Sequence, residues 1–146
     1  MFPRVLTIVL AETTLDLGHQ PPMMALQSLV EFTFDYHLKN AALIRLIMVE
    51  NIHKGRHVAK LPAATPVNSP ILNTVADILM RGEAAGVIRP GLDAFDVYTT
   101  IAALSFFNVS NRYTFRAIFR HDMGDPQQAA LRRQSAWETV RRYVAI

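Results

Sequence analysis

The stretch DAFDVYTTIAALSFFNVSN, residues 93–111, decides the fold. Asp93 has the side chain of a helix N-cap, and Asp96 adds a second carboxylate at the positive end of the helix dipole. The middle of the stretch is almost entirely apolar. We therefore predict a helix that begins after Asp93, ends at about Asn111 and has a strongly apolar middle.

The rest of the chain repeats apolar spacings of three and four, with hardly any sustained alternation of two that would indicate strands. Glycine and proline clusters separate the segments, and three prolines make residues 61–70 a loop or a broken helix. Residues 114–119 are predicted as a short turn. The predicted fold class is all-α, a bundle of about five to six helices over residues 4–17, 22–39, 41–57, 70–85, 93–111 and 126–144.

A length of 146 residues suits one domain, 1–146. With 51% hydrophobic and 18% charged residues, the composition excludes disorder and favours an apolar surface reserved for a partner or ligand. The absence of cysteine excludes disulfides, thiolate metal sites and thiol nucleophiles. No segment approaches about 20 uninterrupted apolar residues, and the first ten residues lack the features of a signal peptide. We expect a cytoplasmic protein without a membrane partner.

Glu50, His53 and His57 would project from one face of a continuous helix and could present three ligands to a metal. The metalloprotease pattern requires a glutamate directly after the first histidine, where Lys54 stands. Alternatively, Lys54, Arg56 and His57 stabilise the negative end of a helix dipole. We favour that interpretation and predict neither a metal nor a cofactor.

Catalytic motifs are missing from the sequence. No serine lies in a Gly-x-Ser-x-Gly elbow, and no glycine-rich phosphate loop is present. Glu31 and Asp35, one helical turn apart, could be paired acid–base carboxylates, but Lys39 completes a charge ladder that is typical of a solvated face. We do not expect an enzyme.

Two aromatic groups, one on each of the predicted helices 22–39 and 93–111, could wall a ligand pocket. They combine apolar bodies with polar tips, which suits a pocket for a small apolar or aromatic effector, although core packing explains the same stripes equally well. The residues we expect at the pocket are Phe34, His37, Met48, Asn51, Tyr98, Ser105 and Asn108.

The last predicted helix interleaves apolar and arginine side chains in helical register, which indicates an apolar seam opposite a solvated basic face. Beside the apolar run 102–109, this seam is a better candidate for burial against another subunit than for DNA. The predicted contacts of a homodimer are Phe106, Val109, Trp137, Val140 and Val144.

Four segments of the sequence carry a resemblance to a known family: LVEFTFDYH (29–37), LIMVENIHKGRH (46–57), ILMRGEAAGVIRPG (78–91) and ALSFFNVSNR (103–112). With them, nearly the whole chain resembles the C-terminal regulatory domain of the TetR/AcrR family of bacterial transcriptional regulators. The resemblance implies that the last two long helices form a four-helix interface in a dimer. It also implies a small-molecule cavity among the middle helices, whose occupancy shifts the spacing of two DNA-reading heads.

In that family the helix-turn-helix precedes this domain, whereas residues 1–17 resemble the middle of the connecting helix. The resemblance thus implies a small-molecule-sensing and dimerisation domain of a repressor, which reaches DNA only through a helix-turn-helix that these residues do not contain. Two alternatives stay open. One is a stand-alone protein that binds ligand or forms heterodimers, and the other is a helix-bundle metal-dependent enzyme that uses Glu50, His53 and His57.

Overall fold

The computed structural model describes residues 16–60 and 70–146, whose regular structure is helical. The all-α fold class predicted from the sequence is confirmed. The helix predicted over residues 4–17 lies outside the described residues except for its last two, which are not helical. None of the described helices is long and apolar enough to cross a membrane. The elements are α2 (Pro22–Lys39), α3 (Ala41–Ile52), the 3-10 helix η1 (Val58–Lys60), α4 (Pro70–Ala84), α5 (Ala94–Ser110), α6 (Arg112–Phe119) and α7 (Pro126–Val144).

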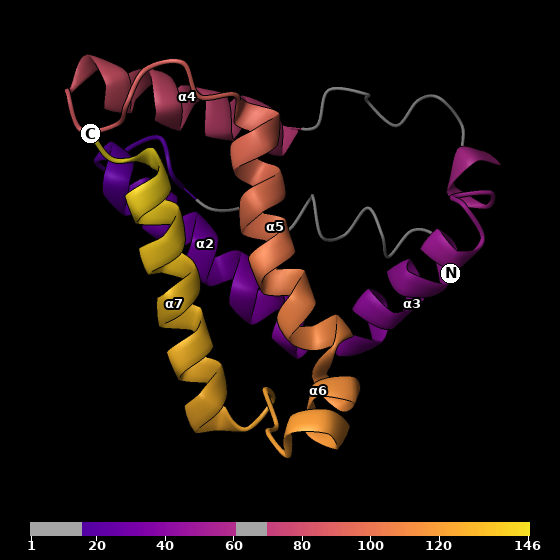
Figure 1. The fold of residues 1–146 in the computed structure, drawn as a ribbon. Coiled ribbons are helices and arrows are strands. Elements are labelled where there is room, and N and C mark those ends of the chain that lie inside the picture. The colour runs from indigo at the N-terminus through magenta and orange to yellow at the C-terminus, as the bar shows by residue number, and fades with distance from the viewer. Residues whose placement is uncertain (1–15, 61–69) are drawn as a thin grey trace.

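Helix α5 lies at the centre of the bundle and contacts α2, α3, α4, α6 and α7 (Figure 1). The Asp93 carboxylate accepts a hydrogen bond from the backbone N–H of Asp96 at 2.9 Å, so the predicted N-cap is confirmed. Val97 and Ile101 of α5 have no exposed surface. The helix predicted to have a strongly apolar middle is therefore the element against which the others pack.

Two cores hold the helices together. The main core lies between α2, α4, α5 and α7, and it includes Leu26, Leu29, Ile78 and Ile101. A minor core of Leu43, Ile44 and Val109 fixes the start of α3 to α5. Beyond that contact α3 points away from α7 (Figure 1). Most of the buried apolar surface therefore lies in the bundle of α2, α4, α5 and α7, and α3 is attached at one end of it.

Two of the predicted boundaries are wrong. Helix α3 ends at Ile52 instead of about His57, because Lys54 and Gly55 adopt left-handed φ angles of 58° and 70°. The predicted turn 114–119 is part of helix α6, which ends where Arg120 takes a left-handed φ of 56°. Glycine adopts a left-handed φ at little energetic cost, which suits Gly55 at the end of α3. Nothing in the local sequence marks Lys54 or Arg120 for such a conformation.

Arginine side chains bind backbone carbonyl oxygens near both ends of the described chain. The Arg81 guanidinium on α4 donates to the carbonyl oxygens of Gln20 and Leu17 at 2.7 and 3.0 Å, and pairs with Asp77 at 2.8 Å. At the other end, the Arg89 guanidinium lies over the Tyr143 ring and donates to the Tyr143 carbonyl oxygen at 2.6 Å. The segment before α2 and the end of α7 are thus both anchored to residues of α4 or the α4–α5 loop.

Gly82 of α4 faces Ile88, a residue of the α4–α5 loop whose side chain is buried. A Cβ at position 82 would overlap the Ile88 side chain. We predict that Gly82→Ala lowers the free energy of unfolding by about 1 kcal/mol or more, because overpacking costs about 1–3 kcal/mol and exceeds the gain of about 1 kcal/mol in helix propensity. Urea denaturation measures the change. Gly18→Ala is the control, since its Cβ would meet nothing; a Gly82→Ala protein as stable as wild type would contradict this packing.

Candidate functional site

Four of the predicted pocket residues lie buried on α2 and α5. His37 is 4% exposed and Asn108 is 1% exposed, and Phe34 and Ser105 are equally inaccessible. The His37 ring meets the edge of Phe106, with ring centroids 6.3 Å apart. Helices α2 and α5 also contact each other directly. Their interface therefore holds polar side chains inside an otherwise apolar bundle.

Only some of these buried polar atoms have hydrogen-bond partners. The Ser105 hydroxyl donates to the Ile101 carbonyl oxygen at 3.0 Å, and the Asn108 amide nitrogen donates to the Met123 carbonyl oxygen at 3.3 Å. Within the part of the chain that the structure describes, His37 Nδ1 and Asn108 Oδ1 are buried without a hydrogen-bond partner. Burial lowers the pKa of His37 to about 4, so its imidazole is neutral at neutral pH.

These two atoms define the chemistry that the interface can offer. A neutral imidazole nitrogen donates or accepts according to its tautomer, whereas an amide oxygen only accepts. Burying such atoms unpaired costs free energy, and buried polar groups without partners recur at functional sites. The His37 and Asn108 side chains are therefore suited to hold an uncharged polar group on an otherwise apolar molecule.

The other three predicted pocket residues lie elsewhere. Tyr98 packs partly buried against the main core, and Met48 packs against the minor core. Asn51 is exposed, and its amide nitrogen donates to the carbonyl oxygen of Ile47 at 2.9 Å. Asn51 thus belongs to the outer surface of α3, because that helix leaves the bundle before it reaches position 51.

A groove of about 330 Å³ runs between α2 and the start of α7. Of the seven predicted pocket residues, Phe34 alone lines it. The Arg133 side chain on its wall donates to Asp35 at 3.0 and 3.2 Å and lies 3.2 Å from Glu31. Glu31 and Asp35 are thus partly exposed, and both carboxylates bind an arginine 98 or more residues away in sequence, which no local pattern reveals.

The alternative metal ligands serve the end of α3 instead. The Glu50 carboxylate accepts from the backbone N–H groups of His57 and Val58 at 2.7 and 3.0 Å, and lies 2.9 Å from His57 Nδ1. These hydrogen bonds lower the pKa of Glu50 although its burial acts in the opposite direction. Among the described residues, no group of three His, Asp or Glu side chains is arranged to hold a metal ion. The chain reverses after Ile52, so the three side chains do not share a helical face.

The predicted dimer contacts divide into two groups. Val140 and Val144 have no exposed surface and Val109 is almost buried, because they pack in the protomer's own cores. They have almost nothing to offer a partner, and for Val140 and Val144 the prediction is wrong. Phe106 and Trp137 are partly buried, Phe106 against the minor core and Trp137 against the main core. The apolar seam of α7 faces α2 and α5 of the same chain.

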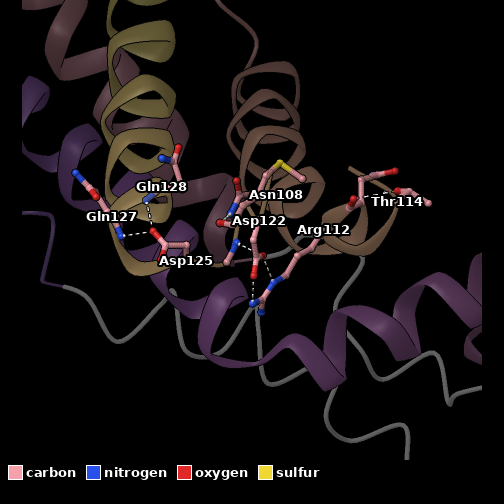
Figure 2. Close-up of polar contacts among 10 residues, drawn as sticks. Asn108, Arg112, Thr114, Asp122, Asp125, Gln127 and Gln128 are labelled. Atoms are coloured by element: carbon pink, nitrogen blue, oxygen red, sulfur yellow. Dashed lines mark hydrogen bonds and ion pairs between the residues drawn. The ribbon is translucent and has the colours of Figure 1, made fainter. Parts of the chain in front are cut away.

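An ion pair at the α6–α7 connection was not predicted either. The Arg112 guanidinium donates to both carboxylate oxygens of Asp122, at 2.7 and 2.9 Å, and Figure 2 shows the two groups facing each other. Asp122 also accepts from the backbone N–H of Gly124 at 2.9 Å. Arg112 and Arg133 therefore each bind specific carboxylates, whereas Arg141 and Arg142 at the end of α7 stay exposed. The pKa of Asp122 lies far below its ordinary value, first because Arg112 donates to it.

Comparison with known proteins gives two matches. A family model described as "Tetracyclin repressor-like, C-terminal domain" matches residues 22–140. The HTH-type transcriptional repressor NicS of Pseudomonas putida is 30% identical over 120 residues, which cover 82% of this chain and 57% of that protein. The aligned region thus spans a little over half the length of this curated relative.

The Arg112–Asp122 pair makes stability depend on pH. Because the folded-state pKa of Asp122 is depressed, its contribution is present above the ordinary pKa of about 4 and is lost as the pH falls below it. We predict that Asp122→Asn lowers Tm at pH 7 and that the difference from wild type shrinks below pH 4. Thermal unfolding followed by circular dichroism tests this, with the exposed Asp16→Asn as control. A difference that stays constant down to pH 2 would contradict it.

Proposed function

The chain belongs to the tetracyclin repressor-like family through its C-terminal domain, and we propose that it is the small-molecule-sensing and dimerising part of a DNA-binding transcriptional repressor. The observation that carries the sensing role is the pair of buried, unpartnered polar atoms on α2 and α5. A domain of this family needs a site where a ligand changes the packing of its helices, and the α2–α5 interface has unused hydrogen-bonding capacity near the C-terminal ends of both helices.

The effector that fits this interface is a small apolar or aromatic molecule with an uncharged hydrogen-bond donor. Its donor would bind Asn108 Oδ1, and His37 Nδ1 would take a second polar atom. The neutral state of His37 disfavours a carboxylate, since the imidazole brings no positive charge. Phe34 and Phe106 supply apolar surface beside these groups. Of the other predicted pocket residues, Ser105 belongs to the same proposed site, whereas Met48 and Tyr98 pack elsewhere, against the minor and the main core.

The same proposal assigns the remaining roles. The partner is a second copy of the chain, and DNA is bound by a helix-turn-helix that lies outside these 146 residues, as the family resemblance implies. The name of the relative describes it as a transcriptional repressor, which favours regulation over catalysis for this chain too. We assign the regulator to the cytoplasm.

The sensing role predicts an unusual stability change. His37→Phe keeps an aromatic ring but removes the unpartnered nitrogen, so we expect it to raise the free energy of unfolding of the ligand-free protein by about 1 kcal/mol, measured with urea. Ser105→Ala is the matched control, because its hydroxyl is equally buried but has a hydrogen-bond partner. The control should not gain stability.

Ligand binding is the second readout of the same variant. We expect at least one of phenol, indole and benzamide, at millimolar concentration, to raise the Tm of wild type and to lose this effect in His37→Phe. If the variant is less stable than wild type and responds equally to these probes, the proposed site is wrong.

Dimerisation is tested by the mass in solution. The chain has a mass of 16.4 kDa, and we expect twice this value by sedimentation equilibrium at micromolar concentration. A mass of 16.4 kDa at every concentration up to 100 µM would contradict the dimerising role.

A further inference from the structure

The groove between α2 and the start of α7 lies next to the two unpartnered polar atoms. Phe34 lines the groove and precedes His37 on α2 by about one helical turn. On the other side of the groove, Gly124 directly follows Met123, whose carbonyl oxygen accepts the hydrogen bond from Asn108. Phe34 and Met123 are themselves buried. The groove and the unpartnered atoms are therefore neighbours, with these two side chains between them.

The groove has an apolar lining and one charged pair. Its apolar lining comes from both helices and consists of Phe34, Leu38, Pro126, Ala129 and Ala130. Asp35 and Arg133 line it as well and carry its charge. Its volume of about 330 Å³ lies at the lower end of the range of roughly 300–1,000 Å³ that is typical of small-molecule sites. The groove therefore suits a molecule with one aromatic ring and a short side chain.

Negative charge is in excess at this pair. The Arg133 guanidinium donates to both oxygens of Asp35, at 3.0 and 3.2 Å, and also lies 3.2 Å from a Glu31 oxygen. One cation is thus shared by two carboxylates. Because a carboxylate offers about four acceptor positions, Asp35 and Glu31 keep unused capacity beside Arg133. Their side chains are 39% and 28% exposed, so a ligand can reach them.

The other charged groups near the groove do not remove this excess. Arg112 and Asp122, next to Gly124, neutralise each other. Lys39 at the end of α2 and Asp125 before α7 carry opposite charges. Arg132 lies about 100° around α7 from its neighbour in sequence and does not line the groove. A cationic ligand is therefore favoured here, whereas an anionic ligand would meet like charge.

We propose that the groove and the unpartnered atoms form one elongated site, and that its ligand is an arylalkylamine with an uncharged hydroxyl or N–H on the ring. This inference rests on the proposed sensing role and narrows the ligand class. The uncharged donor binds Asn108 Oδ1, and the ammonium group binds Asp35 while Arg133 keeps its contact with Glu31. The ring lies beside Phe34, whose side chain shifts to join the two halves of the site.

Three phenols of similar size test the charge of the ligand by chemical-shift titration of the protein at pH 7. Tyramine is a cation, 4-ethylphenol is neutral and 3-(4-hydroxyphenyl)propionate is an anion. We expect tyramine to bind about fivefold or more tightly than 4-ethylphenol, because hydrogen bonds between charged groups are about twice as strong as neutral ones. The anion should bind more weakly than either. Equal binding of tyramine and 4-ethylphenol, or tightest binding of the anion, would overturn the inference.

The same titrations separate this inference from the sensing role on which it rests. If 4-ethylphenol binds wild type but not His37→Phe, and tyramine has no advantage over it, the buried site stands and the extension into the groove is wrong. If none of the three phenols binds wild type at millimolar concentration, both are wrong.

Asp35→Asn tests the proposed contact of the ammonium group. The substitution keeps the shape of the side chain and removes its charge, so tyramine should lose its advantage while the affinity for 4-ethylphenol stays close to that of wild type. Asp77→Asn on α4 is the matched control, because Asp77 also pairs with an arginine, Arg81 at 2.8 Å, but does not line this groove. An undiminished advantage of tyramine in Asp35→Asn would rule out this contact.

Ala130→Leu tests the groove itself. Ala130 is exposed on α7 and lines the groove, so a leucine there fills part of the groove without entering the core. We expect tyramine to bind this variant about fivefold or more weakly, since its side chain loses the space that it occupies. Ala76→Leu makes the same change at an exposed position of α4 and should bind tyramine like wild type. Circular dichroism verifies folding, and full tyramine affinity in a folded Ala130→Leu protein would contradict the proposal.

Discussion

Burial of α5 is the constraint on which the rest of the structure depends. Every other described α-helix contacts α5, and its inner face supplies residues to both cores. A helix surrounded in this way has little exposed surface, so the position of each residue on the helix decides what its side chain contacts. Val97 and Ile101 hold the bundle, Ser105 and Asn108 bring polarity into it, and Phe95 and Phe107 remain outside. Residues of the core and of the proposed ligand site thus alternate along one helix.

This arrangement would connect the proposed ligand site with the rest of the domain. A molecule that binds between α2 and α5 has to change how α5 packs, since a close-packed interior does not deform at one point alone. The outer side of α5 then moves with the inner side. The carbonyl oxygens that Arg81 holds connect α4 with the segment before α2, so a shift of the bundle also reaches that segment. Coupling of this kind requires no conformational change beyond the shift of α5 and the elements packed against it.

The sequence predicted a helix or a cap correctly wherever a local pattern of residues determines it. Apolar spacing predicted α2, α5 and α7 to within a residue or two, and Asp93 was recognised as an N-cap from its own neighbourhood. The positions of His37 and Asn108 on apolar helices marked them as candidate pocket residues, and the structure shows that both are buried. By contrast, no local pattern marks Lys54 or Arg120 for a left-handed conformation, so the end of α3 and the existence of α6 were missed. The same holds for the partners of Arg112 and Arg133. Amphipathicity alone also did not distinguish a seam facing a partner from one facing the chain's own core, which is why Val140 and Val144 were misassigned.

The central claim is that a neutral, buried imidazole lies ready for a ligand between α2 and α5. An NMR titration of the ring resonances of the five histidines tests it most directly. The account predicts that the His37 ring keeps its neutral chemical shifts down to a pKa of about 4. A His37 titration midpoint at the ordinary value of about 6.5 would show that the ring is in contact with solvent, and would contradict the site.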